Sequence, residues 1–394
     1  MTEKTFLARP NSTIYLITIP VMAMVSLGLL MVLSASSVKS YEQSGNTYSI
    51  VVKQLLFLAI ALGAGALAFR FSVVAWSKIA RVALILSLGI LLLPIFPGLG
   101  RTINGNTSWI GVGPFTVQPS EFAKFGLILF CALQLRRYEE RGVKTHTFKP
   151  VLMVTPGVLL VLALIMVGKD LGTALIVMGI AGSMIFVSGL QISQFLLLMV
   201  AGLGMASAFV VAQPNRLHRF TAILHPFSAQ NYKFAGWQTA HSIMGLASGG
   251  WFGVGLGASR QKWANLSEAN TDFIFSVIGE EMGLLGTLFV LSLYAVLIFG
   301  IFRVALQTKD LFSRYAAAGV ACWLMIQVAV NLGSDVGLFP VIGVTLPFIS
   351  YGGSSLISNI FAIAFVLNIA CRDHGIKLFN RKAAVRLTSV PGGE

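Results

Sequence analysis

The sequence contains few charged residues and few cysteines. Of its 394 residues, 56% are hydrophobic and only 11% are charged, with a mean hydropathy of +0.82. This composition excludes an ordinary soluble globular domain, in which about a quarter of the residues carry a charge. Cys131, Cys322 and Cys371 have no paired spacing, which argues against a disulfide framework and a cysteine-based metal site. The chain is therefore expected to be an integral membrane protein.

Apolar runs long enough to cross a bilayer recur along almost the whole chain. A hydrocarbon core of roughly 30 Å needs about 20 apolar residues per helix, and lipid offers no partner to unpaired backbone groups. The sequence therefore predicts an all-α, polytopic membrane protein of about ten transmembrane helices. The predicted spans are 14–36, 50–69, 79–96, 120–136, 150–168, 171–189, 192–212, 273–302, 314–334 and 353–371. The first lacks a small-residue cleavage site and is expected to be retained.

Basic residues gather on one side of these predicted spans. By the positive-inside rule that side is the cytoplasm, which places both termini there and requires an even number of spans. The net charge of +14 is thus attributed to topology and to anionic lipid rather than to nucleic acid. The residues are Arg70, Lys78, Arg81, Arg136, Arg137, Arg141, Lys144, Lys149, Arg303, Lys309, Arg314, Arg372, Lys377, Arg381, Lys382 and Arg386. We expect a cytoplasmic N-terminus at 1–13, one transmembrane domain at 14–371 and a basic cytoplasmic tail at 372–394.

The longest polar segment, 213–272, lies between the seventh and eighth predicted spans, on the extracytoplasmic side. Its length of about 60 residues exceeds that of an ordinary connection. Its basic side chains predict an anionic ligand outside the cell, although long loops also escape the charge rule. They are Arg216, His218, Arg219, Lys233, Arg260 and Lys262. The glycine run "GGWFGVGLG" at 249–257 lacks the strand and lysine of a phosphate-binding loop, so it predicts close backbone packing instead.

Three acids occur in "NTDFIFSVIGEEMG" at 270–283, at the start of the eighth predicted span. Asp272 has two interpretations: an N-cap of the following helix, or an ionisable carboxylate at the water boundary. The residues that would share its helical face are small: Ser276, Gly279, Gly283 and Gly286. Glu280 and Glu281 are interpreted as buried acids satisfied by hydroxyl or basic partners, and we assign them no chemistry.

Other polar groups are expected to converge on the same side of the membrane. Glu121 and Lys124 stand three apart on one helical face, where an ion pair is the simplest explanation. Asp170 occupies a capping position before the sixth predicted span. The ninth span carries a polar edge, and the irregular segment "TLPFISYGGSS" at 345–355 precedes the tenth. The polar edge consists of Gln327, Asn331 and Asp335.

Four ordered motifs of the chain resemble the SEDS family (shape, elongation, division and sporulation) of bacterial wall-synthesis proteins, which includes FtsW and RodA. The motifs are "NGNTSWIGVGPFTVQPSEFAK", "DLGT", "SEANTDFIFSVIGEEMG" and "GVTLPFISYGGSS", and the resemblance covers about residues 14–371. Within the family, "GEE" of the third motif and "TLPFISYGGSS" of the last resemble the division branch more than the elongation branch. Two residues depart from the family pattern: Asn270 stands where His is more usual, and Lys169 where Pro is more usual, which leaves an unchanged role for Asp170 open.

The resemblance implies a multi-pass glycosyltransferase of the bacterial inner membrane. Such an enzyme polymerises lipid II, the undecaprenyl-linked disaccharide peptide, beside a class B penicillin-binding protein and other division proteins. It also implies that Asp272 is the essential carboxylate, with Glu121, Lys124 and Asp170 as further site residues. A carboxylate is suited to take the proton from an attacking sugar hydroxyl, with inversion at the donor carbon and undecaprenyl pyrophosphate as the leaving group.

Cations and polar side chains are needed to hold the substrate's pyrophosphate and sugars. The candidates for binding the pyrophosphate are Lys124, Arg101, Arg216, Arg219 and Lys262, and the further substrate-binding candidates are Gln238, Asn270, Ser350 and Ser354. A divalent cation, Mg²⁺ or Mn²⁺, could share this task, but no ligand cluster in the sequence demonstrates one. The alternatives are a lipid II flippase, an elongation-type polymerase or a non-catalytic scaffold.

Overall fold

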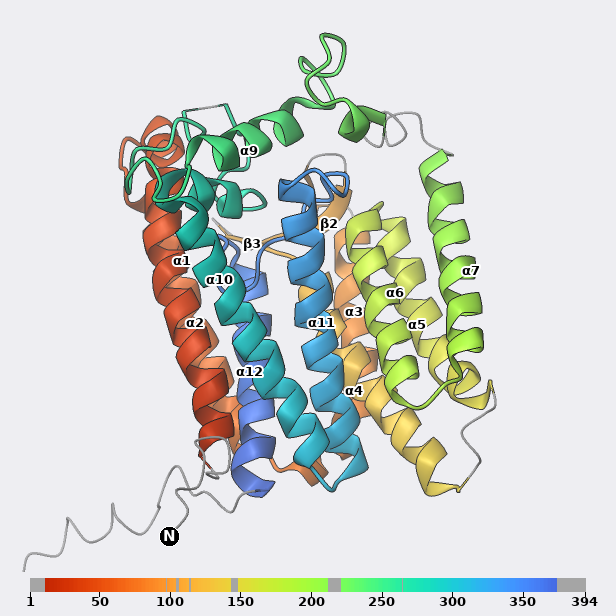
Figure 1. Ribbon diagram of the computed structural model, residues 1–394. Helices are drawn as coiled ribbons and strands as arrows, with labels where there is room; N and C mark the ends of the chain where they lie inside the picture. Colours follow the sequence, from red (N-terminus) through yellow and green to blue (C-terminus); the bar gives the residue numbers. More distant parts are fainter. Residues whose placement is uncertain are drawn as a thin grey trace, which may run out of the picture.

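The computed structural model shows a bundle of long helices, with a shorter helix lying across one end (Figure 1). It describes residues 11–373 except 97, 104–105, 113–114, 143–147, 212–220 and 264. The long helices are α1 (Ser12–Ser44), α2 (Ser49–Arg70), α3 (Val73–Leu92), α4 (Pro119–Glu140), α5 (Lys149–Val167), α6 (Leu171–Val187), α7 (Ile192–Val211), α10 (Ile274–Gln307), α11 (Leu311–Asp335) and α12 (Gly353–Asp373). A short 3₁₀ turn, η2 (Leu93–Ile95), follows α3.

Each of the ten predicted spans corresponds to one of these helices, which confirms the all-α prediction. Seven are long and apolar enough to cross a membrane, whereas α6 and α7 contain shorter apolar stretches. The remaining helix, α4, carries several charged residues, including Glu121 and Lys124, which lower its hydropathy. The N-terminal residues 1–10 and the tail from 374 onward lie outside the described residues, so the predicted boundaries at 13 and 372 stay predictions.

Local sequence signals explain several helix ends. The Ser72 hydroxyl accepts a hydrogen bond from the Ala75 backbone N–H and caps α3, and Asp310 caps α11 in the same way. Pro119 occupies the first turn of α4, where a missing N–H costs nothing. Gly45 ends α1 with a left-handed φ of 67°, a conformation that glycine adopts without strain.

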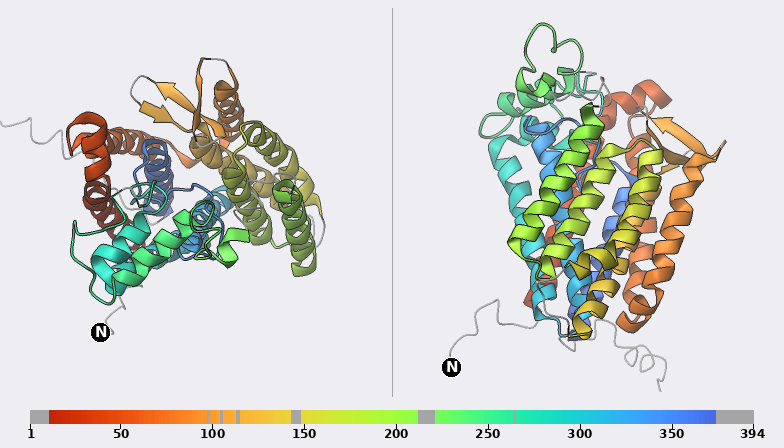
Figure 2. Two further views of the ribbon diagram at one scale, coloured as in Figure 1. Left: turned by 90° about the horizontal axis from the view of Figure 1, so that it is seen from above. Right: turned by 90° about the vertical axis from the view of Figure 1, so that its right-hand side faces the viewer.

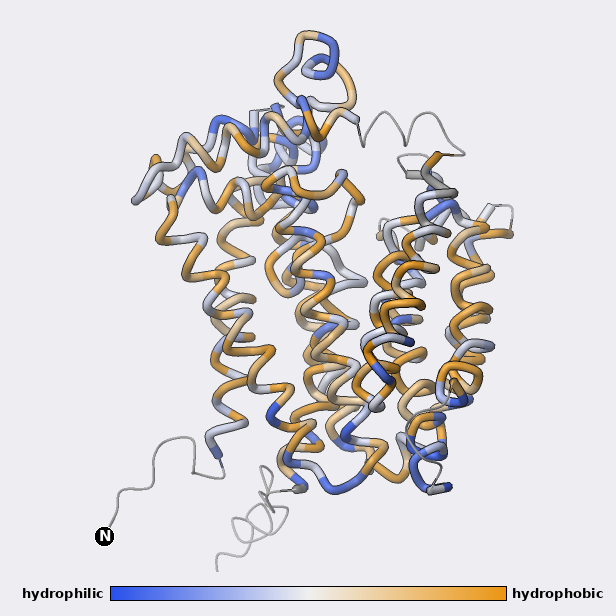
Figure 3. The backbone as a smooth tube through the Cα atoms, turned by 45° about the vertical axis from the view of Figure 1, so that its right-hand side comes forward, coloured by the Kyte–Doolittle hydropathy of each residue, from blue (hydrophilic) through white to orange (hydrophobic). Residues whose placement is uncertain are grey.

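Two ends of the bundle differ in composition. The end that carries the transverse helix α9 (Trp237–Ser248), here called the α9 face, also carries a three-stranded antiparallel sheet that the sequence analysis missed. Its strands are β1 (Gly100–Ile103), β2 (Asn106–Val112) and β3 (Phe115–Val117). The opposite end, here called the basic end, holds hydrophilic turns between otherwise hydrophobic helices (Figure 3). The separation agrees with the two sides predicted from charge.

Helix α11 is one of the most enclosed helices of the bundle. It packs against α4, α6 and α10, and most of its side chains are buried. Four aromatic rings from α3, α4 and α12 form a second buried cluster, with centroid separations of 5.3–5.9 Å in edge-on geometry. In contrast, α7 stands at the edge of the bundle and packs on α6 (Figures 1 and 2).

The glycine run after α9 is joined to α10 by backbone hydrogen bonds. Gly283 has a left-handed φ of 68° and kinks α10, which interrupts the helical hydrogen bonds. The freed N–H groups of Leu284 and Leu285 donate to Gly250 O and Trp251 O at 2.8 and 3.2 Å. In return, the carbonyls of residues 280 and 281 accept from the N–H groups of residues 254 and 255. The segment 249–255 is thus spliced into the kink, which confirms the predicted close backbone packing.

Two glycines of this run provide a matched test of that packing. Gly253 and Gly257 share a φ of 81°, but a Cβ on Gly253 would lie 2.1 Å from the Glu281 carbonyl, whereas nothing lies within 4 Å of a Cβ on Gly257. Gly257→Ala should cost about 1–2 kcal/mol of unfolding free energy, from backbone strain alone. Gly253→Ala should cost clearly more, because the α10 backbone must also move. Thermal unfolding in detergent measures both losses of stability. Equal losses would contradict the close packing of segment 249–255 against α10.

Candidate functional site

Asp272 lies on the α9 face, two residues before α10 begins. The N-cap of α10 is Phe273, and no side chain caps this helix end. The capping interpretation of Asp272 is therefore wrong. Within the described part of the chain, its carboxylate has no hydrogen-bond donor, while its backbone carbonyl accepts from Asn331 Nδ2 at 2.7 Å. The carboxylate is thus held in place by its backbone and left chemically available.

The surroundings of Asp272 disfavour its charged form. Asp272 is partly exposed, but many protein atoms surround its carboxylate. Burial, together with the nearby Glu268 carboxylate and against the opposing charge of Lys39, raises the pKa of Asp272 to about 7. Lys39 Nζ lies 3.6 Å from Glu268 Oε2 and so neutralises part of that charge. A carboxylate with a pKa near neutrality is matched to general-base work at neutral pH.

A small cavity adjoins Asp272. Its lining comes from the residues just before α10, the end of α11 and the segment after α11; it consists of Asp272, Phe273, Asn331, Ser334, Asp335, Val341, Ile342, Gly343 and Val344. It has room for about one water molecule. Gly343 has a φ of 80°, and a Cβ there would lie 3.6 Å from Asp272 Oδ2, so glycine brings the backbone close to the carboxylate.

The irregular segment before α12 is bonded directly to the chain around Asp272. Ser350 Oγ donates to the Thr271 carbonyl at 2.5 Å and accepts from the Leu346 N–H at 2.9 Å. The Tyr351 N–H donates to the Asn270 carbonyl at 2.9 Å. Asn270 and Ser350, both predicted to bind substrate, are buried, and these bonds fix the backbone on either side of the base.

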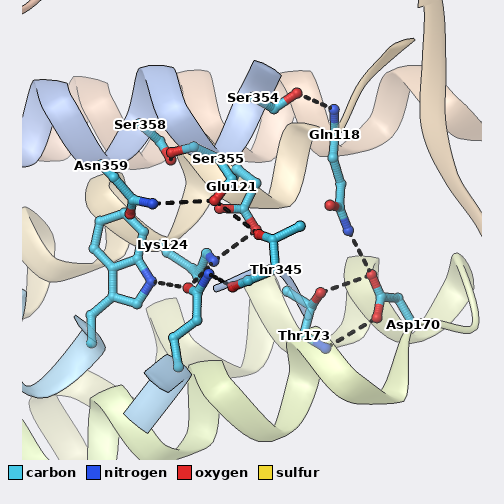
Figure 4. Close-up of polar contacts among 12 residues, drawn as sticks. Gln118, Glu121, Lys124, Asp170, Thr173, Thr345, Ser354, Ser355, Ser358 and Asn359 are labelled. Atoms are coloured by element: carbon cyan, nitrogen blue, oxygen red, sulfur yellow. Dashed lines mark hydrogen bonds and ion pairs between the residues drawn. The ribbon is translucent and has the colours of Figure 1, made fainter. Parts of the chain in front are cut away.

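Asp170 and Ser354 meet through Gln118 (Figure 4). Asp170 caps α6 through the Thr173 N–H at 3.0 Å and also accepts from Gln118 Nε2 at 3.1 Å. The Gln118 backbone N–H donates to Ser354 Oγ at 2.9 Å. The capping interpretation of Asp170 is confirmed. Lys169 has a φ of 61°, which the ring of proline cannot adopt, so this chain enters α6 by a backbone geometry that its lysine permits.

Glu121 and Lys124 form the predicted ion pair, deep among α4, α11 and the segment before α12. Lys124 Nζ lies 2.8 Å from Glu121 Oε1 and 2.8 Å from Gln327 Oε1, and its side chain is 1% exposed. Gln327 Nε2 donates to the Thr345 carbonyl at 3.0 Å. Figure 4 shows this pair among the hydroxyls of α12. The ammonium is therefore enclosed and fully engaged, rather than directed to solvent as its predicted role in phosphate binding would require.

Glu280 and Glu281 are buried and both accept from hydroxyl groups, as expected, although Glu281 Oε2 has no hydrogen-bond partner among the described residues. The Glu280 carboxylate accepts from the Ser259 hydroxyl and from two backbone N–H groups at 2.5–3.4 Å, and Glu281 accepts from the Ser34 hydroxyl at 2.6 Å. Lys262 Nζ donates to the Gly257 carbonyl and lies 3.9 Å from Glu281 Oε1. Together these contacts hold the segment 257–262 against α10.

The other predicted binding residues are spread over the α9 face. Gln238 donates to Ser267 Oγ at 2.9 Å, close to the chain that leads to Asp272. Arg101 is exposed on β1, opposite Trp109 of β2. Arg216 and Arg219 lie outside the described residues. Among the residues that the structure describes, no group of three His, Cys, Asp or Glu side chains is arranged to hold a metal ion.

Two residues near Asp272 were not assigned a role from the sequence. Lys39, at the end of α1, is distant in sequence, and only the fold brings it to Glu268. Asp335 was recognised as part of a polar edge, but nothing in the sequence places it in the same cavity as Asp272. The available signals were a cation near the end of the first predicted span and an acid at the end of the ninth.

Comparison with known proteins places this geometry in a family. The model of the FtsW/RodA/SpoVE family, described as "Cell cycle protein", matches residues 14–374. The "Probable peptidoglycan glycosyltransferase FtsW" of Pseudomonas fluorescens (strain SBW25) is 37% identical over 88% of this chain and 85% of its own. "Stage V sporulation protein E" of Bacillus subtilis (strain 168) is 36% identical over 90% of this chain and 96% of its own.

Solved structures agree with the sequence comparison. A chain from work described as "Structural coordination of polymerization and crosslinking by a peptidoglycan synthase complex" superposes with a TM-score of 0.71 and 30% identity, over 90% of this chain and 96% of that one. The rod shape determining protein RodA of Thermus thermophilus superposes with a TM-score of 0.66 and 29% identity, over 94% and 99%. The chain therefore belongs to the FtsW/RodA/SpoVE family of polytopic membrane proteins.

Proposed function

We propose that this protein is a peptidoglycan glycosyltransferase of the bacterial cytoplasmic membrane, which polymerises lipid II with its α9 face directed outward and both termini in the cytoplasm. One observation carries the proposal. The Asp272 carboxylate on that face caps no helix, is surrounded by protein atoms and has a pKa raised to about 7. The names of the similar proteins supply the reaction class. FtsW-type relatives favour a role in division, beside a class B penicillin-binding protein and other division proteins.

In this mechanism Asp272 removes the proton from the acceptor sugar hydroxyl. The resulting oxygen attacks the anomeric carbon of the donor, the carbon–oxygen bond to undecaprenyl pyrophosphate breaks, and the configuration at carbon is inverted. General-base catalysis of this kind contributes typically about 10²- to 10⁴-fold in rate. The site residues around Asp272 serve to fix its backbone, since Asn331, Ser350 and Asn270 all bond the chain on either side of it.

Substrate binding requires positive charge on the α9 face. Arg101 is exposed there and is our first candidate for the pyrophosphate, with Arg216 and Arg219 retained as predictions. Lys262 bonds to Gly257 and Gln238 bonds to Ser267, at the two ends of the segment 257–267. We propose that both contact the substrate beside this segment. Lys124 could bind phosphate only by giving up its bonds to Glu121 and Gln327, so we assign it, with Asp170 and Ser354, to positioning the segment before α12.

Purified protein with labelled lipid II tests the proposal directly. Glycan chains formed by this protein, with no second transferase present, support the polymerase. Movement of lipid II between leaflets without polymer would identify a flippase instead, and neither activity would leave a scaffold. The assay is to be run with and without a class B penicillin-binding protein, because a partner can be required for activity. Comparing division-type with elongation-type partners then decides between the two branches.

The pKa of Asp272 predicts how the rate depends on pH. The folded protein holds this pKa at about 7, above the usual 3.8, so the basic form accumulates only as pH rises through 7. Polymerisation at limiting substrate should therefore fall about tenfold per pH unit below that value. The sign is fixed by burial, which disfavours the charged carboxylate. A rate that stays constant from pH 7 down to pH 5 would show that Asp272 is not the titrating base.

A further inference from the structure

Asp335 is a second carboxyl at the candidate site. It is the last residue of α11, and it is fully buried. Ser242 of α9 donates to its backbone carbonyl at 2.7 Å, which fixes the main chain there. Among the described residues, neither carboxylate oxygen of Asp335 has a partner with hydrogen-bond geometry, although the hydroxyl and the N–H of Ser276 lie close to the group. A buried carboxyl group with so little hydrogen bonding is costly and calls for an explanation.

Asp335 and Asp272 line the same small cavity. Of the nine lining residues, these two are the titratable ones, and Asn331 contributes a further buried oxygen, Oδ1, that lacks a donor. The two carboxyl groups also interact electrostatically. The cavity has room for about one water molecule. It is thus surrounded by hydrogen-bond acceptors from two carboxyl groups and one amide, and within the described part of the chain no side chain donates to them with hydrogen-bond geometry.

Charged and titratable groups on the neighbouring elements do not neutralise Asp335. Lys39 of α1 is engaged with Glu268, 3.6 Å from its Oε2. His241 of α9 stacks on Trp237 and its Nδ1 lies 3.0 Å from the Trp237 carbonyl. The other facing groups are Glu121 and Lys124 of α4, paired with each other, Asp170 capping α6, Glu280 on α10 and Tyr351 before α12. None of them lines the cavity.

Two ionised carboxylates facing one small, nearly dry cavity repel each other, and each loses its hydration. A single proton held between the two groups removes both costs, because it supplies the missing donor and cancels one charge. Carboxyl pairs in this arrangement titrate as a unit. We propose that Asp335 and Asp272 share one proton at neutral pH, held mainly on Asp335 and donated to the Asp272 carboxylate directly or through one water molecule.

On this proposal Asp335 is a positioning residue for the base. The hydrogen bond from its hydroxyl occupies one oxygen of Asp272 and leaves the other to accept the proton from the sugar. When the sugar oxygen bonds to the donor carbon, its proton passes to Asp272, while the shared proton stays on Asp335. This catalytic part rests on the proposed function, whereas the shared proton does not, and the two are tested separately.

Infrared difference spectroscopy of the purified protein tests the shared proton without any substrate. The wild type at neutral pH should show a carboxylic-acid carbonyl band that shifts in D₂O. Asp335→Asn should remove this band, and Asp272→Asn should shift it. Glu42→Gln, at an exposed position near the end of α1, should leave it unchanged. A spectrum of Asp335→Asn that retains the whole band would overturn the proposal, whether or not the protein polymerises lipid II.

The pH profile of polymerisation separates positioning from a purely structural role. Asp335→Leu removes the donor, so the acid limb set by Asp272 should move up by about one pH unit, with about a fivefold loss at pH 7. Asp335→Asn keeps a donor in its amide and should restore the position of that limb. If both variants instead lose activity equally at every pH, Asp335 merely supports the fold. Circular dichroism of each variant identifies any that fails to fold.

Discussion

Asp272→Asn is expected to reduce lipid II polymerisation by about 10²- to 10⁴-fold, the range that a general base contributes. The amide keeps the size of the side chain but cannot accept the sugar proton. Folding should be unaffected, because Asp272 caps no helix and its carboxylate makes no hydrogen bond within the described residues. Measuring polymer length and yield from labelled lipid II checks the loss, and thermal unfolding checks the fold.

A matched variant controls for the change from acid to amide. Asp310 also precedes a helix, but it lies at the basic end and caps α11 through Ser313. Asp310→Asn preserves that capping ability and should retain polymerisation. If Asp272→Asn polymerises as well as Asp310→Asn does, Asp272 is not the base, and the proposed chemistry has no proton acceptor.

Lys124→Met should give the largest loss of stability among the substitutions considered. It removes the partner of a buried carboxylate, and breaking a buried ion pair from one side typically costs about 3–5 kcal/mol. Glu121, itself buried, would be left without its cation, and Gln327 would lose a donor. The double variant Glu121→Gln/Lys124→Met removes both charges and should recover most of the loss. Thermal unfolding in detergent measures all three proteins.

The exposed pair on the same helix provides the comparison. Arg136 and Glu140 lie 2.7 Å apart in α4, but their side chains are 33% and 48% exposed. Breaking such a pair should cost less than about 1 kcal/mol, because water replaces the lost partner. Equal losses from Lys124→Met and Arg136→Met would mean that the inner pair does not behave as a buried one.

The helices could be predicted because each one obeys a local rule. Hydrophobic length located all ten long helices, and the ends at Ser72, Pro119 and Asp170 carry residues that start helices in any protein. The pairing of Glu121 with Lys124 could also be predicted, since residues three apart face the same way. These features depend on short stretches of sequence, which is why sequence reasoning sufficed.

The arrangement around Asp272 could not be predicted in the same way. An Asp just before an apolar run is typical of a helix cap. However, α10 begins at Ile274, so the cap position belongs to Phe273 and Asp272 lies one residue too early. The cavity joins Asp335 and Gly343 to Asp272 from three separate parts of the chain. Lys124 was predicted to bind phosphate, but the structure places it in a buried network, because the depth of a side chain depends on neighbours such as Gln327 that no local pattern specifies.

The kink at Gly283 divides α10 into two pieces with different attachments. The N–H groups of residues 254 and 255 donate to carbonyls of the upper piece, at residues 280 and 281, while the carbonyls of residues 250 and 251 accept from N–H groups of the lower piece, at residues 284 and 285. The segment 249–255 therefore bridges the kink, and a bend at Gly283 would have to break one of these two sets of hydrogen bonds. This brace fixes the direction of the upper piece, and with it the chain that leaves Asp272, relative to the rest of α10.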